Sequence, residues 1–217
     1  MGCRTLIGAT APGGAYTARW LHWGDQPDQL VPILRRIWRD TFAADTAALA
    51  AALLARDWST LDPQPSGDTF PALVVAGVGH ETRGGSGGPR HGRLAEAVGA
   101  DLEWLYLVDV AIDSVVVYEA TRHSRWLRHS VHFLDPVDDL FVTAPGTAGD
   151  GTEMTVCTVC GAVDEIDYRE LPSMAGYGHD TSTACIRCGS SVVTDPMFGA
   201  HVTRKPWPSA TPPETAR

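Results

Sequence analysis

The stretches that decide the fold of the last third of this chain are Cys157-Thr158-Val159-Cys160-Gly161 and Cys185-Ile186-Arg187-Cys188-Gly189. Each is a Cys-x-x-Cys-Gly motif, and together they hold four of the five cysteines. Two such motifs bring four thiolates to one tetrahedral metal ion, and the glycine after each second cysteine lets the backbone turn tightly. Because two ordered copies rarely arise by chance, we predict that Cys157, Cys160, Cys185 and Cys188 bind one metal ion.

The predicted metal is zinc in a structural role. Four thiolates close the coordination shell of the ion and leave no open position for water or substrate. In a module too small to have a hydrophobic core, metal binding supplies folding free energy. Iron occupies the same ligand set in rubredoxin-like centres, but no other feature of this sequence indicates redox function, so zinc is favoured.

Composition predicts a soluble, folded protein. The chain has 217 residues, of which 44% are hydrophobic and 20% charged, as is typical of globular domains. It contains no apolar run of about 18 residues, and its N-terminus lacks a charged region followed by a hydrophobic one. We therefore expect neither a membrane helix nor a secretory signal, but a cytoplasmic protein whose cysteines bind metal rather than form disulfides.

Turn-forming residues mark the expected domain boundaries. Residues 144–151 collect such residues without a hydrophobic period, which predicts a linker. A main domain at 1–143 would precede it, and a zinc module at 152–203 would follow. The proline-rich tail at 204–217 cannot form regular structure, because proline removes hydrogen-bond donors and restricts φ, so it is predicted to be disordered.

The main domain is predicted to open with a β-hairpin. Residues 3–10 and 15–23 are rich in strand-forming residues and are separated by Ala11-Pro12-Gly13-Gly14, a turn sequence. Centring the turn on Pro12-Gly13 pairs residues whose numbers sum to 25. This register places Cys3 opposite His22, and turns Ile7 and Trp20 together toward the core.

Helices and further strands are expected after the hairpin. Apolar residues recur at helical spacing over 28–42, with the helix starting near Pro32, and Asp45 is the predicted N-cap of a second helix at 47–56. Four further strands are predicted, at residues 72–78, 103–108, 115–120 and 126–133. The expected fold class is α+β: an antiparallel sheet of N-terminal hairpin and C-terminal meander, covered by two helices, with an appended four-cysteine zinc ribbon.

Parts of the first 135 residues resemble a group of uncharacterised proteins from actinobacteria and bacteriophages. The similarity lies in Arg4-Thr5-Leu6-Ile7-Gly8, in residues 18–27, and in the later segments 103–109 and 115–118. Where that group has a Trp-Asp-Gly-Tyr-Pro turn, this chain has Trp23-Gly24-Asp25-Gln26-Pro27. The resemblance implies an α+β fold and a link to mobile elements, and no activity. The last third resembles the zinc-ribbon class, common in transcription, translation and protein-assembly factors.

Charge favours a protein partner over nucleic acid. The chain carries a formal net charge of -9, and residues 153–203 hold seven acidic against two basic residues. A metal bound by four thiolates adds about -2, and such a surface repels phosphate backbones. We therefore predict a protein-binding or regulatory protein rather than an enzyme. The candidate binding residues are Trp23, Asp25, Asp164, Glu165 and Asp167.

Two alternatives stay open. The predicted hairpin register brings Cys3 and His22 together, with Asp25 nearby, which is the pattern of a cysteine nucleophile with an activating base. It resembles N-terminal-nucleophile hydrolases and would make the chain a cysteine-dependent amidohydrolase. The second alternative is a nucleic-acid-associated factor, because the segment from Arg122 to Arg128 is the main basic and aromatic cluster.

Overall fold

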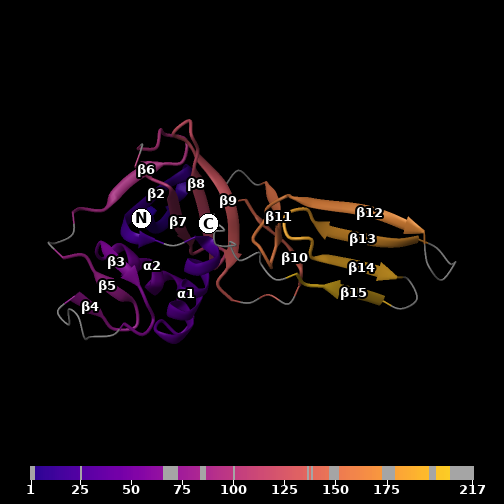
Figure 1. The fold of residues 1–217 in the computed structure, drawn as a ribbon, viewed down its shortest axis with the longest axis horizontal. Coiled ribbons are helices and arrows are strands. Elements are labelled where there is room, and N and C mark those ends of the chain that lie inside the picture. Colours follow the sequence, from indigo (N-terminus) through magenta and orange to yellow (C-terminus); the bar gives the residue numbers. More distant parts are fainter. Residues whose placement is uncertain are drawn as a thin grey trace, which may run out of the picture. The chain divides into compact units, whose positions relative to one another are not determined.

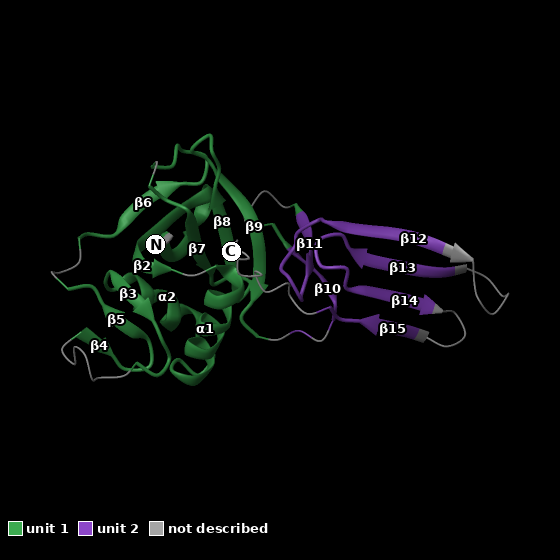
Figure 2. Ribbon diagram, in the orientation of Figure 1, with its two compact units in different colours: residues 1–135, 145–152 green, residues 136–144, 153–217 purple. Residues whose placement is uncertain are grey.

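The computed structural model describes residues 3–24, 26–65, 73–83, 87–99, 101–135, 137, 139–146, 152–172, 179–195 and 199–205. The chain divides into two compact units (Figure 2). Unit 1 contains residues 1–135 and 145–152, and unit 2 contains residues 136–144 and 153–217. The predicted disordered tail beyond residue 205, and most of the predicted linker, lie outside the described residues.

Unit 1 is built on a nine-stranded sheet (Figure 1). In spatial order its path is β4 (Val74–Val75), β5 (Gly79–Glu81), β3 (Trp58–Leu61), β2 (Ala15–Gly24), β1 (Cys3–Ala11), β7 (Trp104–Asp109), β8 (Ser114–Ala120) and β9 (Trp126–Phe133), with β6 (Arg90–Arg93) paired to β2. Two pairs are parallel, β1 with β7 and β2 with β3, and the other pairs are antiparallel. The sheet is therefore mixed.

The predicted hairpin is present, but its register is shifted by one residue. The turn consists of three residues, Pro12–Gly14, and both glycines have positive φ, 70° at Gly13 and 71° at Gly14. Because a third residue enters the turn, paired numbers sum to 26 instead of 25, so that Leu6 pairs with Trp20. The predicted register is therefore wrong, since a shift of one residue changes which side chains share a face.

Two helices pack on one face of this sheet. Helix α1 (Pro27–Asp40) begins at Pro27, five residues before the expected start, and carries Pro32 within it. Helix α2 (Thr46–Leu54) begins after Asp45, whose carboxylate accepts a hydrogen bond from the Ala48 N–H at 2.9 Å. The two predicted helices and this N-cap are thus confirmed, with shorter C-terminal ends.

The main hydrophobic core lies between these helices and the sheet. Its helical contributors include Leu34 and Ile37 of α1 and Leu49 and Leu53 of α2, all with no exposed surface. From the sheet it takes large buried side chains, namely Ile7, Leu21, Trp58, Trp104, Tyr106, Val108, Val115 and Val117. Ile7 therefore faces the core as expected, whereas Trp20 pairs with Leu6 and points to the other face.

The expected α+β class with an antiparallel sheet is wrong, because the structure is mostly β. Strands account for 49% of it and helices for 16%, in three sheets with two α-helices among the described residues. Pattern analysis missed β3, β5 and β6, which have three or four residues each and are too short to show a period. It also missed the parallel pairs, because pairing between distant segments leaves no local signal.

Removal of the α2 N-cap provides a test of this packing. Asp45→Ala leaves the N–H of Ala48 without its side-chain acceptor, and we expect unit 1 to lose about 1 kcal/mol of stability. Urea unfolding followed by far-ultraviolet circular dichroism measures this loss. Asp45→Asn is the matched control, because asparagine caps helices equally well and should change stability by about a few tenths of a kcal/mol at most.

Unit 2 consists of two small sheets. Strands β10 (Phe141–Pro145) and β11 (Glu153–Cys157) form a two-stranded sheet. A four-stranded antiparallel meander follows, made of β12 (Ile166–Pro172), β13 (His179–Cys185), β14 (Ser191–Asp195) and β15 (Gly199–Thr203). Figure 1 shows these four strands side by side in one layer. The four predicted ligand cysteines all lie at the end of this unit where β11 and β13 finish.

Candidate metal centre

Each pair of cysteines sits in a tight turn at the end of a strand. Cys157 ends β11 and Cys185 ends β13, and each second cysteine follows three residues later. The turns have the same hydrogen bonds: Gly161 N–H donates to the Cys157 carbonyl and Gly189 N–H to the Cys185 carbonyl, both at 2.8 Å. These glycines have φ of 71° and 73°, a conformation that costs little only for glycine. The motif glycines thus have the predicted role.

The two turns also present backbone donors to sulfur at equivalent positions. The N–H groups of the third and fourth residues of each Cys-x-x-Cys turn donate to the sulfur of its first cysteine. Two further donors follow the second cysteines: Ala162 N–H donates to Cys160, and Ser190 N–H lies 3.4 Å from the Cys188 Sγ. Backbone donors aimed at sulfur stabilise thiolates, so both turns are arranged for the charged form of cysteine.

The sulfur atoms are spaced as a tetrahedral metal site requires. All four lie within 4.8 Å of one another, with Cys157 Sγ 3.8 Å from Cys188 Sγ and Cys160 Sγ 3.6 Å from Cys185 Sγ. A tetrahedron with metal–sulfur bonds of about 2.3 Å has sulfur–sulfur edges of about 3.8 Å. A disulfide would need about 2.05 Å, and all four cysteines are free. The donor set and its spacing therefore fit a metal ion.

The pKa values of the four thiols also favour a bound cation. A hydrogen bond from the Cys160 thiol lowers the pKa of Cys157 to about 5. That same bond, together with burial, raises the pKa of Cys160, and burial raises the pKa of Cys185. One thiolate therefore forms easily, and each further negative charge is resisted by the first. A divalent cation removes this repulsion and allows all four to ionise.

Apolar side chains and one ion pair surround the cysteines. Cys157, Cys160 and Cys185 are buried with Ala162, and partly buried hydrophobic residues pack against them, namely Phe141, Val159 and Ile166. Arg187 of the second turn forms a salt bridge with Glu165, which follows the first turn. The Ile186 N–H also donates to the Glu165 carbonyl at 2.9 Å. These contacts join the two turns independently of a metal.

Sequence reasoning missed two supporting residues. The hydroxyl of buried Ser190 accepts the backbone N–H of Lys205 at 2.9 Å and lies 3.2 Å from the Cys188 sulfur. Phe141 comes from β10, before the first motif. Ser190 lies two residues after Cys188, and this spacing is a local signal for a contact with the Cys188 sulfur. Phe141 has no such signal, because its contact depends on the pairing of β10 with β11.

The predicted cysteine–histidine pair is not formed. Gly24, not His22, pairs with Cys3, because the register shifts again between Cys3 and Thr5. His22 is exposed, and its ring stacks on Trp20 with centroids 6.3 Å apart. Asp25, the third member of the proposed catalytic group, lies outside the described residues. The pairing on which the amidohydrolase alternative depended is therefore absent.

The other predicted binding residues are placed as follows. Trp23 at the end of β2 is 58% exposed. Asp164 has φ of 57°, and its carboxylate accepts the Thr155 N–H at 2.8 Å, so it supports a turn. Glu165 pairs with Arg187, and Asp167 pairs with Arg169 at 2.6 Å. These three acidic residues of unit 2 thus make internal contacts.

In the basic and aromatic segment, Arg122 and Arg125 are exposed, and Trp126 and Arg128 are partly buried. Buried His132 lies 2.8 Å from the hydroxyl of Ser130, which is also buried. His129 contacts the same hydroxyl at 3.0 Å, and its ring meets the edge of Trp104. These two histidines follow the segment and contribute to packing around β9, so the nucleic-acid alternative stays a prediction.

Comparison with known proteins identifies no relative. No family model, curated protein or solved structure matches the chain. The resemblance to actinobacterial and phage proteins therefore stays a prediction. No helix in the described part of the chain combines the length and apolar character needed to cross a bilayer.

Proposed function

We propose that this chain is a zinc-ribbon protein that binds another protein through one face of the β12–β15 sheet. Zinc is the metal we assign, because four thiolates at tetrahedral spacing form a closed, structural zinc site. Its role is to hold together the end of a sheet that has little core of its own. The observation that carries the proposed function is an exposed and almost uncharged face on that sheet.

The pairing of the four strands defines this face. Tyr168 pairs with Thr183, Thr183 with Val192, and Val192 with Val202, so one row crosses the whole sheet. The adjacent row on the same side contains Glu170, Thr181, Thr194 and Ala200. We call these eight residues the tyrosine face. Glu170 is its one charged residue.

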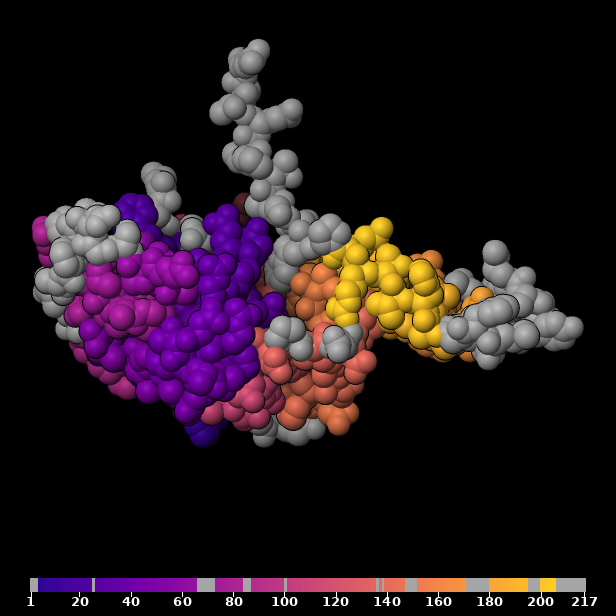
Figure 3. All heavy atoms as spheres, turned by 90° about the horizontal axis from the view of Figure 1, so that it is seen from below, coloured from indigo at the N-terminus to yellow at the C-terminus, as the bar shows by residue number. Residues whose placement is uncertain are grey.

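The tyrosine face is accessible. Tyr168 is 62% exposed and Val202 is 46% exposed. Figure 3, seen from below, shows the β15 edge of this sheet in yellow. A tyrosine beside β-branched residues provides a large contact area with little loss of side-chain entropy, and tyrosine is enriched among residues that dominate binding energy.

The opposite face has a different character. It carries the ion pair of Asp167 and Arg169, and exposed His201 on β15. Successive residues of a strand point to opposite sides, so Val202 lies on the tyrosine face and His201 on the opposite face. Charged and polar side chains that pair with one another or with water gain little from contact with another protein, so the tyrosine face is the better candidate for the binding surface.

Charge indicates the chemistry of the partner. Residues 153–203 carry seven acidic and two basic residues, and a zinc ion bound by four thiolates adds about -2. In a complex with a second copy of this chain, acidic residues of the two copies would repel one another. In a complex with nucleic acid, the phosphates would be repelled by the same acidic residues. A protein with an apolar centre and a basic rim is complementary instead, and we commit to that partner.

Site-specific photo-crosslinking tests the proposal. Benzoylphenylalanine in place of Tyr168, in the full metal-loaded chain expressed in cells, should form a covalent adduct with one protein that mass spectrometry identifies. Purified, that protein should bind the chain, and raising the salt from about 0.1 to 1 M should weaken binding because the Debye length falls from about 10 to 3 Å. Val202→Asp should weaken binding at least about tenfold, since it buries a charge.

His201→Asp is the matched control, because it adds the same carboxylate one residue away on the opposite face. It should leave the affinity within about twofold. Three results contradict the proposal: equal losses in the two variants, adducts only between copies of this chain, or no adduct at position 168. Circular dichroism of both variants checks that the ribbon sheet is intact.

A further inference from the structure

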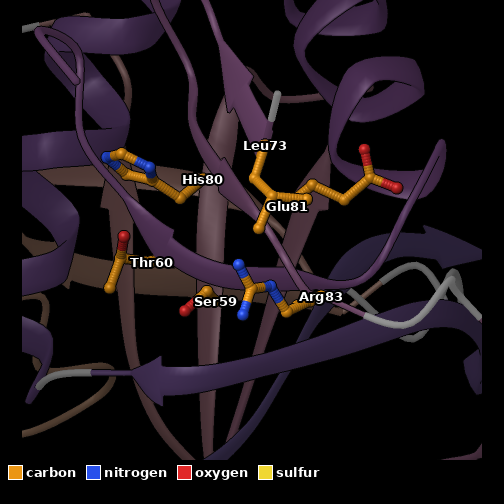
Figure 4. Close-up of a pocket in the computed structure, with 6 residues that line it drawn as sticks. All are labelled: Ser59, Thr60, Leu73, His80, Glu81 and Arg83. Atoms are coloured by element: carbon orange, nitrogen blue, oxygen red, sulfur yellow. The ribbon is translucent and has the colours of Figure 1, made fainter. Parts of the chain in front are cut away.

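The cysteine cluster differs from the small cavity of unit 1 in that its reactive groups converge. The cavity lies beside β3 and β5, and Figure 4 shows two of its polar side chains, His80 and Glu81, pointing in opposite directions. The carboxylate of Glu81 is engaged by Arg56 in a salt bridge at 3.2 Å. The four cysteine sulfurs instead lie within 4.8 Å of one another, so a reaction at one sulfur directly affects the others.

The four cysteines differ in their access to solvent. Cys157, Cys160 and Cys185 are at most 1% exposed, whereas Cys188 is partly exposed. The thiolate is the reactive form of cysteine, and metal coordination holds each sulfur in that form. A small oxidant that arrives from solvent therefore meets the Cys188 thiolate first.

Ser190 places a hydroxyl beside the Cys188 sulfur. Its oxygen lies 3.2 Å from the Cys188 Sγ, and the Ser190 N–H lies 3.4 Å from the same atom. The hydroxyl oxygen accepts the Lys205 N–H, so its own proton is left to donate toward the sulfur once metal binding has removed the thiol proton. The same hydroxyl can donate to an oxygen that leaves from this sulfur.

Cys157 supplies a second sulfur from the other turn. Its Sγ lies 3.8 Å from the Cys188 Sγ, and a disulfide needs about 2.05 Å. The salt bridge of Arg187 with Glu165, and the bond from the Ile186 N–H to the Glu165 carbonyl, hold the two turns together without the metal. The two sulfurs therefore stay neighbours while metal coordination is being lost.

We propose that Cys188 is a modification site for hydroperoxides, and that its oxidation produces a Cys157–Cys188 disulfide and releases the zinc ion. The Cys188 thiolate attacks one oxygen of hydrogen peroxide, the O–O bond breaks and hydroxide leaves, which gives a sulfenic acid. The Cys157 thiolate then attacks the Cys188 sulfur, the S–O bond breaks and a second hydroxide leaves. Each hydroxide takes up a proton from solvent, so one peroxide is reduced to two water molecules and the two thiolates are oxidised by two electrons.

Loss of two ligands disrupts the metal site, and the effect extends to the tyrosine face. Cys160 and Cys185 alone leave zinc with two protein ligands instead of four, too few for a structural site. Cys185 pairs with Ile166, and the pair of Tyr168 with Thr183 lies two positions further along the same two strands. The inference rests on the zinc site and the tyrosine face of the proposed function, and it adds that peroxide weakens both.

Peroxide treatment of the full zinc-loaded chain tests the proposal. A chromogenic chelator measures the released zinc, and mass spectrometry of proteolytic peptides, after alkylation of the remaining thiols, identifies the disulfide. We expect about one zinc ion per chain to be released as the Cys157–Cys188 disulfide forms, together with faster hydrogen exchange in β13. Dithiothreitol and zinc should reverse both changes.

Two results overturn the proposal. One is a main product with a Cys157–Cys160 or Cys185–Cys188 disulfide, and the other is zinc still bound when glutathione in a parallel sample is fully oxidised. Neither readout requires a binding partner, so they are independent of whether the tyrosine face binds a protein. An untreated chain that holds no zinc would contradict the zinc assignment itself, and this inference with it.

Histidine substitutions locate the reaction. Cys188→His keeps four ligands, because three cysteines and one histidine also form a structural zinc site, but it removes the partly exposed sulfur. Its zinc release should be at least about tenfold slower than that of the unmodified chain. Equal rates in the two proteins would contradict Cys188 as the reactive site.

Cys157→His is the matched control, because it also replaces one thiolate with an imidazole. It should leave Cys188 reactive, so that dimedone traps a sulfenic acid at Cys188 and no disulfide to position 157 forms. Absence of the dimedone adduct at Cys188 would contradict the first step. If histidine at either position prevents zinc binding, the disulfide map of the unmodified chain decides the proposal.

Discussion

Cys160→Ser is expected to reduce the bound metal from one ion per chain to a trace and to unfold the β12–β15 sheet. The Cys160 sulfur is buried 3.6 Å from that of Cys185, and the serine hydroxyl that replaces it is a far weaker ligand than a thiolate for a metal bound by sulfur. Structural zinc binding by four such ligands contributes about 10 to 16 kcal/mol, far more than a sheet with few buried residues supplies. Unit 1 has its own core and should stay folded.

Metal analysis and hydrogen exchange measure the two parts of this result. Inductively coupled plasma mass spectrometry gives the metal content, and exchange rates of peptides from β13 and β7 report on units 2 and 1. Cys3→Ser is the matched control, since it makes the same chemical change in β1 and should keep a full equivalent of metal. Normal protection of β13 in a metal-free Cys160→Ser protein would contradict a structural role for the metal.

Trp58→Ala is expected to lower the stability of unit 1 by about 3 to 5 kcal/mol. Trp58 is fully buried between the helices and the sheet, and its indole N–H donates to the Leu53 carbonyl at 3.0 Å. Truncation removes a large apolar contact, leaves a cavity and frees that carbonyl. Because the chain has two units, the loss should be read from unit 1 alone, by exchange or proteolysis of β1 and β7 peptides in urea.

Trp23→Ala provides the comparison. Trp23 is 58% exposed, so its truncation should change stability by about 0.5 kcal/mol or less. The large difference between the two tryptophans is the expected result. Similar losses in both variants would mean that Trp58 is not a central core residue.

Local signals were enough to predict several elements correctly. The Cys-x-x-Cys-Gly spacing indicated both turns of the metal centre, because their hydrogen bonds join residues within a few positions. Helix α1 was visible from its apolar period and α2 from its Asp45 cap. Strand β9 was predicted with its observed bounds, Trp126–Phe133.

Features that depend on pairing between distant segments were not predictable in this way. The parallel contact of β1 with β7 joins residues about a hundred positions apart, and nothing in either strand specifies its partner. One extra residue in the turn at Pro12–Gly14 moved the hairpin register, and with it the partner of Cys3. The bulge at Ser59 lies between two short strands, and such strands carry little pattern.

The path of the chain between the two units limits how unit 2 can be separated from the rest of the protein. Residues 136–144 belong to unit 2, and residues 145–152 return to unit 1 before the chain enters unit 2 again. A fragment starting at Glu153 would lose the Leu140 carbonyl, which accepts the Thr158 N–H at 2.9 Å, and the ring of Phe141. Gene fusions that transfer unit 2 to another protein therefore need a 5′ boundary near codon 136. A cut at the cysteine-rich segment alone would deliver an incomplete module.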